Sequence, residues 1–258
     1  MADTVSPIYD KRSYDRLPHL RFIGDVHGGP NMSAYLRLAY SAHYTVQVGD
    51  LGFEYGKLAL LDPREHKVVA GNHDNYEKNE QGIFVKQTPH FLGDFGTHAI
   101  PGFGEFFFVR GENSIDRKYR VFGRNWWYDE ELSNDQANAA LEAYKVAKPR
   151  VVVSHGCPTS VIPAIVPPRE FDGVLLKPSK TAHLLDAMLA VHAPELWIFG
   201  HYHVSVTYQT DKTLFRCLNE LETLNFPEFK EAQVKPSVEL ASDTPPDQSK
   251  STDERSNV

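Results

Sequence analysis

The sequence predicts a mixed α/β body in which helices cover layers of sheet. Three observations lead to this prediction: short apolar segments that each end in a polar cluster, helix-like stretches between them, and a hairpin-like segment near the end. The chain has 258 residues, of which 41% are hydrophobic and 12% are aromatic. This is enough apolar material for one large core or two modest ones, and it excludes a fibre or a fully disordered chain.

Five short apolar segments are the predicted strands. Each is too short for a helix and too continuous for a strand with one wet face, which favours strands buried on both faces. An abrupt polar cluster, usually opened by glycine, follows each apolar part and therefore lies at the carboxyl end of the strand. The segments are LRFIGDVHG (20–28), YTVQVGDLG (44–52), HKVVAGNHD (66–74), RVVVSHGCP (150–158) and ELWIFGHYH (195–203).

Amphipathic stretches between these segments predict the covering helices. The first spans 32–42, and Asn31 is a plausible N-cap for it. The second follows Ser133, which forms a capping-box pattern with Gln136. A third helix is expected over 181–192, where a proline shortly afterwards ends it.

The last part of the chain predicts a hairpin followed by a tail. Segment 205–218 has two β-rich arms about a central Asp-Lys pair, which indicates a hairpin rather than a crossover. Residues 227–258 mix prolines, serines and charges with a single aromatic residue, so we expect a disordered tail there. Residues 1–14 are expected to be loosely ordered, which leaves 15–226 as the folded domain.

Charge and cysteine content narrow the classes of partner. Aspartate and glutamate number 34 against 27 lysine and arginine, a formal charge of −7, so no stable nucleic-acid binding is expected. Cys157 and Cys217 have no paired spacing, which favours a reducing compartment. No apolar run reaches the length of about 18 residues that a membrane-spanning helix needs. We therefore expect a cytoplasmic protein without a membrane partner; the sequence leaves its oligomeric state open.

The polar clusters at the strand ends hold the candidate functional residues. In open α/β sheets the ligand crevice lies outside the carboxyl ends of the strands, so these clusters are expected to share one pocket. Asp25-x-His27 and His201-x-His203 each place two candidates two residues apart, and extended chain leaving a strand can aim both inward. The candidate set is Asp25, His27, Asp50, Asn72, His73, Asp74, His155, His201 and His203.

The donor atoms in this set point to divalent cations. They are carboxylate oxygens, imidazole nitrogens and one carboxamide oxygen, without a thiolate, which suits manganese, iron, zinc or nickel better than a structural zinc site. If Asp50 bridges, the set suffices for two ions with positions left for water and substrate. Two such ions keep a net positive charge beside two aspartates and a hydroxide, which favours an anionic substrate such as a phosphate ester.

The ordered motifs resemble those of the calcineurin-like metallophosphoesterase superfamily. The family pattern of D-x-H, GD, GNH(D/E), a lone H and GHxH is matched in order by residues 24–28, 49–50, 71–74, 155–156 and 200–203. Among its members, the chain is most similar to small predicted phosphoesterases of bacteria and phages, through SIDR (114–117), the Trp126-Trp127 pair and SHGCP. The resemblance implies an αββα sandwich of mixed sheets, with 15–226 as the metallophosphoesterase domain and the metal site at the carboxyl ends of the strands.

The resemblance also implies a role for each candidate. Its first metal is held by Asp25, His27 and His203, its second by Asn72, His155 and His201, and Asp50 bridges the two. A hydroxide between the ions attacks phosphorus, while His73 protonates or stabilises the leaving oxygen and Asp74 orients His73. The residues favour the same role for His73, because a neighbouring carboxylate raises its imidazolium fraction near neutral pH. Manganese is the first choice of ion.

Three functions remain open at this point. The leading hypothesis is hydrolysis of a monoester or diester of a small phosphorylated molecule or nucleotide. A serine/threonine protein phosphatase is disfavoured because Asp50 leads into Leu51-Gly52-Phe53 instead of an aspartate-arginine extension, and Asp74 replaces the glutamate of those enzymes. A non-catalytic scaffold is disfavoured because a complete polar cluster is costly to bury without a metal.

Residues around the motifs have structural interpretations as well as functional ones. We expect Trp126 and Trp127 to close a core rather than to line a groove. Arg117 and Arg124 are expected to be solvated rather than to contact phosphate. The proline-rich segment 159–179 either rims the pocket or acts as a spacer.

Overall fold

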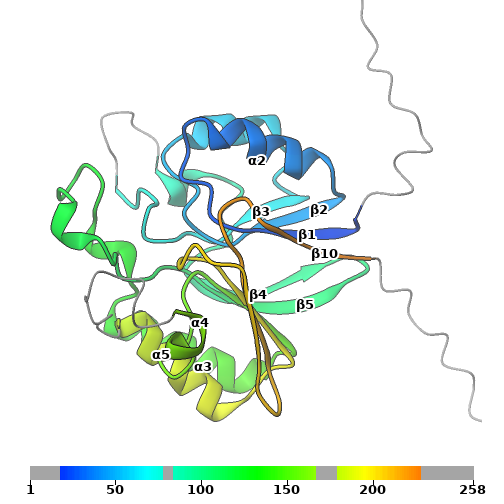
Figure 1. The fold of residues 1–258 in the computed structure, drawn as a ribbon, viewed down its shortest axis with the longest axis vertical. Coiled ribbons are helices and arrows are strands. Elements are labelled where there is room, and N and C mark those ends of the chain that lie inside the picture. Colours follow the sequence, from blue (N-terminus) through cyan, green and yellow to red (C-terminus); the bar gives the residue numbers. More distant parts are fainter. Residues whose placement is uncertain (1–17, 78–83, 167–178, 228–258) are drawn as a thin grey trace, which may run out of the picture.

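Two β-sheets lie face to face in the computed structural model, and helices cover their outer faces (Figure 1). The structure describes residues 18–77, 84–166 and 179–227. Helix α2 (Asn31–Tyr40) lies over one sheet, and α3 (Asn134–Ala147) and α5 (Lys180–Val191) lie over the other. The predicted αββα sandwich is therefore confirmed. The terminal segment 1–14 and the tail 227–258, apart from Pro227, lie outside the described residues.

The smaller sheet has four strands in the order β10-β1-β2-β3. Its three parallel strands are the first three apolar segments of the sequence, and β10 pairs antiparallel with β1. All four residues of β1 are buried, as expected for a strand covered on both faces. The bounds are β1 (Leu20–Ile23), β2 (Tyr44–Gln47), β3 (His66–Val68) and β10 (Thr223–Phe226).

The larger sheet has six strands in the order β4-β5-β6-β7-β9-β8. Strands β5, β6, β7 and β9 run parallel, while β4 and β8 are antiparallel edges. The β8–β9 pair is the hairpin predicted within 205–218. The bounds are β4 (Phe95–Ile100), β5 (Gly104–Val109), β6 (Val151–Ser154), β7 (Leu196–Phe199), β8 (Val206–Gln209) and β9 (Leu214–Cys217).

Apolar side chains fill three layers. Between the sheets, Phe22 and Val46 from one side meet Val153 and Ile198 from the other. Outside them, α2 packs its own buried face on the smaller sheet and α3 and α5 pack on the larger. Burial of each such side chain contributes about 1.5–3 kcal/mol. These layers therefore fix the position of the parallel strands of one sheet relative to the parallel strands of the other.

Two of the three covering helices, α3 and α5, begin with a side-chain cap close to where the sequence predicts their start. In α3 the predicted capping box forms, since Ser133 Oγ accepts from Gln136 N at 3.3 Å and Gln136 Oε1 accepts from Ser133 N at 2.9 Å. In α5, Ser179 Oγ accepts from Ala182 N. For α2 the prediction was wrong: Asn31 is already helical, and its Nδ2 donates to the carbonyl oxygen of Val26. A turn through two glycines with positive φ delivers the chain straight into this helix.

The remaining short helical elements lie in the connections. One of them, α4, falls in the described part of the proline-rich segment 159–179, where Val161 and Ile165 join the core under the larger sheet. Residues 167–178 lie outside the described residues, so the predicted rim is not tested there. The short elements are α4 (Ile162–Ile165) and the 3₁₀ turns Tyr55–Leu60, Val85–Gln87, Arg117–Tyr119 and Tyr128–Glu130.

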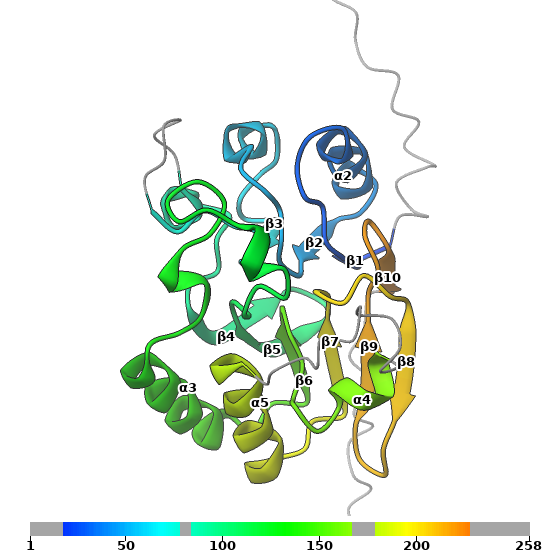
Figure 2. The ribbon, with the colours of Figure 1, turned by 60° about the vertical axis from the view of Figure 1, so that its left-hand side comes forward.

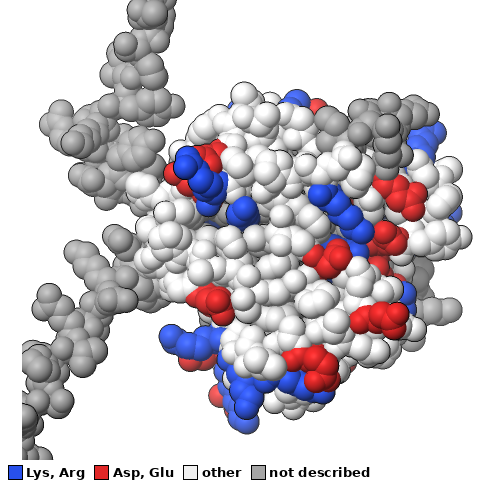
Figure 3. Space-filling view, turned by 180° about the vertical axis from the view of Figure 1, so that it is seen from behind, with Lys and Arg blue, Asp and Glu red and all other residues white. Residues whose placement is uncertain are grey.

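Charged side chains of both signs are interspersed on the face shown in Figure 3. Among the described residues of that face, neither lysine and arginine nor aspartate and glutamate form a continuous band. In the described parts of the chain, none of the helices combines the length and the apolar character that crossing a bilayer requires.

Candidate metal centre

The loops that follow β1, β2, β3, β6 and β7 converge between the two sheets (Figure 2). They bring two groups of metal-capable side chains together, and within each group the candidate ligand atoms lie within 4.8 Å of one another. Asp50 belongs to both groups. The first group is Asp25, His27, Asp50 and His203, and the second is Asp50, His155 and His201.

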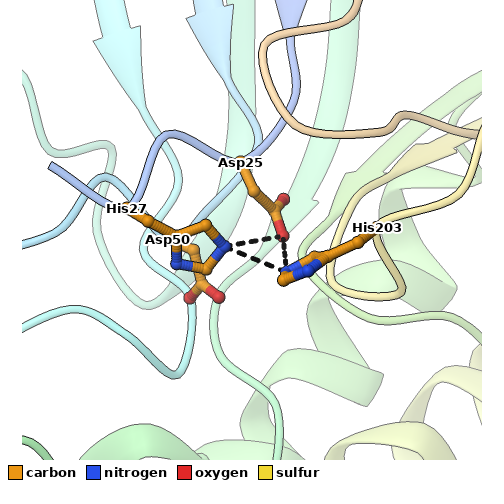
Figure 4. Close-up of side chains that lie close together, drawn as sticks. All are labelled: Asp25, His27, Asp50 and His203. Carbon is orange, nitrogen blue, oxygen red and sulfur yellow. Dashed lines mark hydrogen bonds and ion pairs between the residues drawn. The ribbon is translucent and has the colours of Figure 1, made fainter. Parts of the chain in front are cut away.

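The first group centres on the carboxylate of Asp25, which is fully buried (Figure 4). Its Oδ2 lies 3.2 Å from Nε2 of His203 and 3.8 Å from Nε2 of His27. The two imidazole nitrogens are 2.9 Å apart and point toward the same side of the carboxylate. The backbone N–H of His201 also donates to this carboxylate, which ties the loop after β7 to the loop after β1.

The second group centres on His155, which is fully buried. Its Nε2 lies 3.2 Å from Oδ1 of Asp50 and 3.0 Å from Oδ1 of Asn72, so the carboxamide oxygen joins this group. Its Nδ1 donates to the carbonyl oxygen of Val48 at 3.0 Å, which fixes the ring and leaves Nε2 facing the cluster. The ring of His201 completes the group, with its centroid 5.0 Å from that of His155.

The buried polar atoms of the cluster fit divalent cations. Oδ2 of Asp50 is buried and has no hydrogen-bond partner among the described residues. A buried carboxylate oxygen without a partner is costly, as is a pair of imidazole nitrogens that face each other. A cation between these atoms would satisfy them together, and the oxygen and nitrogen donors are those that manganese, iron, zinc and nickel accept.

The buried carboxylate of Asp50 and the buried ring of His155 favour each other's charged forms. Burial opposes ionisation of both partners, yet the attraction between them lowers the pKa of Asp50 well below its usual value and raises the pKa of His155 to about 10. Burial and the charge of His155 lower the pKa of His201. His155 therefore carries the compensating charge, and metal binding at this pair would release its proton.

Four of the candidate ligands have left-handed backbone conformations. The φ angles are +58° at His27, +58° at Asp50, +70° at His201 and +51° at His203. The expectation that extended chain aims the paired ligands inward was therefore wrong, because the backbone turns at these residues instead. A left-handed residue other than glycine costs about 1–2 kcal/mol, so the surrounding packing holds the ligands in place against local preference.

The glycines that open two of the motifs leave room for the cluster. Gly49 has a φ of +111°, and a Cβ there would overlap the ring of His155. A Cβ at Gly71 would overlap the carboxylate of Asp50 and lie 2.6 Å from Nε2 of His155. The GD and GNHD motifs therefore need glycine because their backbones pack against ligand side chains.

His73 and Asp74 have different surroundings from those expected. Asp74 is fully buried; its Oδ2 accepts from the backbone N–H of Asp50 at 3.0 Å and of Gly71 at 2.7 Å, and its Oδ1 accepts from Tyr55. It thus joins the loops after β2 and β3 rather than orienting the His73 ring. Burial, reinforced by the charge of Asp50, raises the pKa of Asp74 to about 7.

The neighbour of the His73 ring is Arg120, whose Nη2 contacts Nε2 of His73. Burial lowers the pKa of His73 to about 4; the carboxylate of Asp50 raises it, and the charge of Arg120 lowers it further. The expected effect of a carboxylate is therefore present, but burial outweighs it, and the expected gain in imidazolium was wrong. Arg120 itself is almost buried, and Asp116 and the carbonyl oxygen of Asn125 hold its other nitrogens.

Arg120 was not predicted, although its neighbours Arg117 and Arg124 in the same segment were singled out from the sequence. Arg117 stacks on the ring of Trp126, and Arg124 is exposed. Trp127 is buried with the core under α2, as predicted, and contacts Phe53 edge to face. The one sequence signal for Arg120 is its spacing of four residues from Asp116, which matches the ion pair that forms.

An open pocket of about 400 Å³ gives access to the cluster. Its polar lining comes from both sheets, and Ile115 and Tyr202 supply an apolar part. The lining residues are Asp50, Asn72, His73, Ile115, Asp116, His201, Tyr202 and His203.

The fold is similar to those of several solved structures. A phosphopantetheinyl hydrolase from Mycobacterium tuberculosis is 15% identical, with 79% of this chain and 90% of that chain covered and a TM-score of 0.46. A dimetal phosphatase from Danio rerio is 14% identical, with 82% and 94% covered and a TM-score of 0.46. At these scores the likenesses carry no conclusion about function. No curated protein matches the sequence.

The sequence itself decides the family. The family model described as calcineurin-like phosphoesterase matches residues 19–205, which contain every motif residue named above. This match confirms the resemblance drawn from the five ordered motifs. The chain therefore belongs to the calcineurin-like phosphoesterase family and is a metal-dependent hydrolase of phosphoester bonds.

Proposed function

We propose that this protein hydrolyses a phosphoester bond of a small phosphorylated molecule or nucleotide at a dinuclear metal centre. The observation that carries the proposal is the position of Asp50, a buried carboxylate shared by two groups of candidate ligands. One carboxylate that reaches both groups is what two neighbouring cations require. Manganese is the proposed ion, with iron, zinc and nickel as alternatives that the same donors accept.

In this proposal each group of side chains holds one ion. Asp25, His27 and His203 would hold the first, while Asn72, His155 and His201 would hold the second, and Asp50 would bridge them. When bound, two such ions supply a bridging hydroxide as nucleophile and neutralise the charge of the phosphoryl oxygens. The net positive charge of the site would favour an anionic substrate.

His73 is the proposed partner of the leaving oxygen. Its ring lies in the pocket lining, and its centroid is 4.6 Å from that of His27. Its backbone N–H donates to Oδ1 of Asp50 at 2.6 Å, which holds the main chain of His73 next to the cluster. From this position a neutral His73 ring would stabilise the oxygen that leaves phosphorus; to protonate it, the ring would need a pKa above the value of about 4 that its burial gives it. Asp74 supports the site by joining the loops that carry Asp50 and Asn72.

The size of the pocket favours a small substrate over a folded phosphoprotein. A volume of about 400 Å³ lies in the range of small-molecule sites. The sequence around Asp50 and Asp74 argues in the same direction, because it departs from that of serine/threonine protein phosphatases. Both cysteines are free and buried, which supports the proposed cytoplasmic location.

Turnover of two simple esters tests the proposal. We expect the purified protein with added Mn²⁺ to hydrolyse p-nitrophenyl phosphate, bis-p-nitrophenyl phosphate or both, and to stop after removal of metal by a chelator. The ratio of the two rates separates monoesterase from diesterase activity. Folded protein that binds two Mn²⁺ ions and hydrolyses neither ester would favour the scaffold instead.

A further inference from the structure

A chain of buried hydrogen bonds leads from Asn72 away from the cluster. Nδ2 of Asn72 donates to Oγ of Ser114 at 3.3 Å, and this hydroxyl donates to Oε2 of Glu130 at 2.5 Å. The backbone N–H of Ser114 donates to the other carboxylate oxygen, Oε1, at 3.2 Å. The exposed fractions of the three residues are 2%, 1% and 3%, so water does not compete for these contacts.

The polarity of this chain is fixed at the Glu130 end. Burial raises the pKa of Glu130. In its ionised form the carboxylate only accepts hydrogen bonds, so the single hydroxyl proton of Ser114 is committed to Glu130. Oγ of Ser114 then offers only lone pairs to its other neighbour. It therefore accepts an N–H from Asn72 and repels a carbonyl oxygen placed there.

This polarity selects one orientation of the Asn72 carboxamide. With Nδ2 on Ser114, Oδ1 lies 3.0 Å from Nε2 of His155 and faces the second group of candidate ligands. The opposite orientation would present an NH₂ group to that position, and an amide NH₂ has no lone pair for a cation. The ligand atom of Asn72 thus depends on two residues that are not themselves candidate ligands.

Backbone contacts hold the two supporting residues in place. The N–H of Gly111 donates to the carbonyl oxygen of Ala70 at 2.8 Å, which joins the segment after β5 to the loop that carries Asn72. Glu130 lies in the 3₁₀ turn Tyr128–Glu130, next to the buried Trp127. Because both supporting residues are anchored in this way, their hydrogen bonds set the orientation of the Asn72 amide, and the amide does not set their positions.

We propose that Glu130, acting through the hydroxyl of Ser114, is a positioning residue that keeps the carboxamide oxygen of Asn72 directed at the second metal ion. This inference rests on the proposed dinuclear centre and extends it to two residues of the segment after β5. Partners of this kind typically change metal affinity by about 10- to 100-fold when they are replaced.

Glu130→Gln is the direct test, because glutamine has the same size and can donate as well as accept. The hydroxyl of Ser114 is then free to donate to Oδ1 of Asn72, so the amide can turn over. We expect the affinity for the second Mn²⁺ ion to fall about 10- to 100-fold while the first is unchanged, as measured by Mn²⁺ titration in a calorimeter. Ser114→Ala should give a similar loss, and the double variant should lose no more than the larger of the two.

A second background separates positioning from a general structural role. In Asn72→Asp the two side-chain oxygens are equivalent, so its orientation no longer matters. Adding Glu130→Gln to Asn72→Asp should therefore not lower Mn²⁺ affinity and should raise it if it changes, because the aspartate oxygen next to Ser114 gains a donor. A general structural defect would lower the affinity in both backgrounds. Glu131→Gln is the matched control, since its carboxylate accepts from Thr181 instead, and it should bind as the wild type does.

Two results would overturn this inference. One is wild-type affinity for both ions in Glu130→Gln and in Ser114→Ala. The other is that Glu130→Gln lowers the Mn²⁺ affinity equally in the protein with Asn72 and in the Asn72→Asp variant. Failure of the wild-type protein to bind two Mn²⁺ ions would instead overturn the dinuclear centre, and the inference with it. The wild-type titration therefore distinguishes the two failures.

Discussion

His73 shows how much of a residue's chemistry its neighbours decide. The sequence places it beside Asn72 and Asp74, but its ring meets Arg120, which lies 47 positions along the chain, and His27. Arg120 brings a fixed positive charge against the ring, so the interaction depends on a loop that sequence patterns do not position. The pocket that the ring lines is nevertheless the one that the motifs predict.

Removal of the His73 ring tests its role in leaving-group departure. We expect His73→Ala to keep two bound metal ions but to slow hydrolysis of esters with poor leaving groups by about 10²- to 10⁴-fold, with less effect on activated esters. The measurement is kcat/KM for a series of aryl phosphates of rising leaving-group pKa. His183→Ala, in an exposed part of α5, serves as the control. Equal slowing across the series would argue against this role.

Single residues were predictable where a motif and a strand end coincide. All nine candidates lie around one cluster because the carboxyl ends of parallel strands meet there. Their contacts were not predictable, since Asp74 bonds to backbone groups of two other loops rather than to its neighbour. The contacts of Ser114, Arg120 and Glu130 with the cluster were not predictable, although Ser114 lies in the SIDR motif, because these contacts arise only from three-dimensional proximity.

At the scale of elements, the sequence predicted the start of a helix correctly where a side chain caps the backbone of that same helix. Helix α3 begins where the capping box predicts, whereas α2 begins after a proline and uses no side-chain cap. Strands β4, β5 and β10 were missed. β4 and β10 are edge strands with half-exposed, irregular patterns rather than buried apolar runs. β5 ends in a buried apolar run that a polar cluster follows, the same signal as in the predicted strands, and it was therefore predictable.

The capping box of α3 gives a prediction about stability. Ser133→Ala removes the acceptor for the N–H of Gln136 and leaves that group without its cap, so the free energy of unfolding should fall by about 0.5–2 kcal/mol. Urea unfolding followed by circular dichroism measures this loss. Asn138→Ala, at an exposed position inside the same helix, should leave stability unchanged or raise it. A similar loss in both variants would contradict the capping explanation.

For the whole molecule, the cluster acts as a joint between the two sheets. Asp25 and Asp50 come from loops of the smaller sheet, while His155, His201 and His203 come from loops of the larger one. The layered α/β body was predictable because strand and helix segments alternate along the chain, and the αββα arrangement was predictable because the ordered motifs resemble those of the family. The placement of one sheet against the other was not predictable, because it depends on the packing of the apolar layer between them.

Metal binding should therefore stabilise the whole fold. At a Mn²⁺ concentration 100 times its Kd, each bound ion adds about 2.7 kcal/mol, which corresponds to a rise in Tm of about 5–10 °C per ion in a domain of this size. Thermal unfolding with and without Mn²⁺ measures the shift. Asp50→Asn removes the carboxylate shared by both groups and should abolish most of the shift together with activity. A full shift in that variant would exclude the bridging role of Asp50.

The left-handed residues of the cluster also bear on how such a chain changes over time. Each of these four positions would be more relaxed as glycine, yet glycine carries no donor atom for a cation. In a descendant protein that no longer needed the metal site, replacing these side chains by glycine would make the fold more stable. The histidines and the aspartate at these four turns persist only while selection favours chemistry over ease of folding.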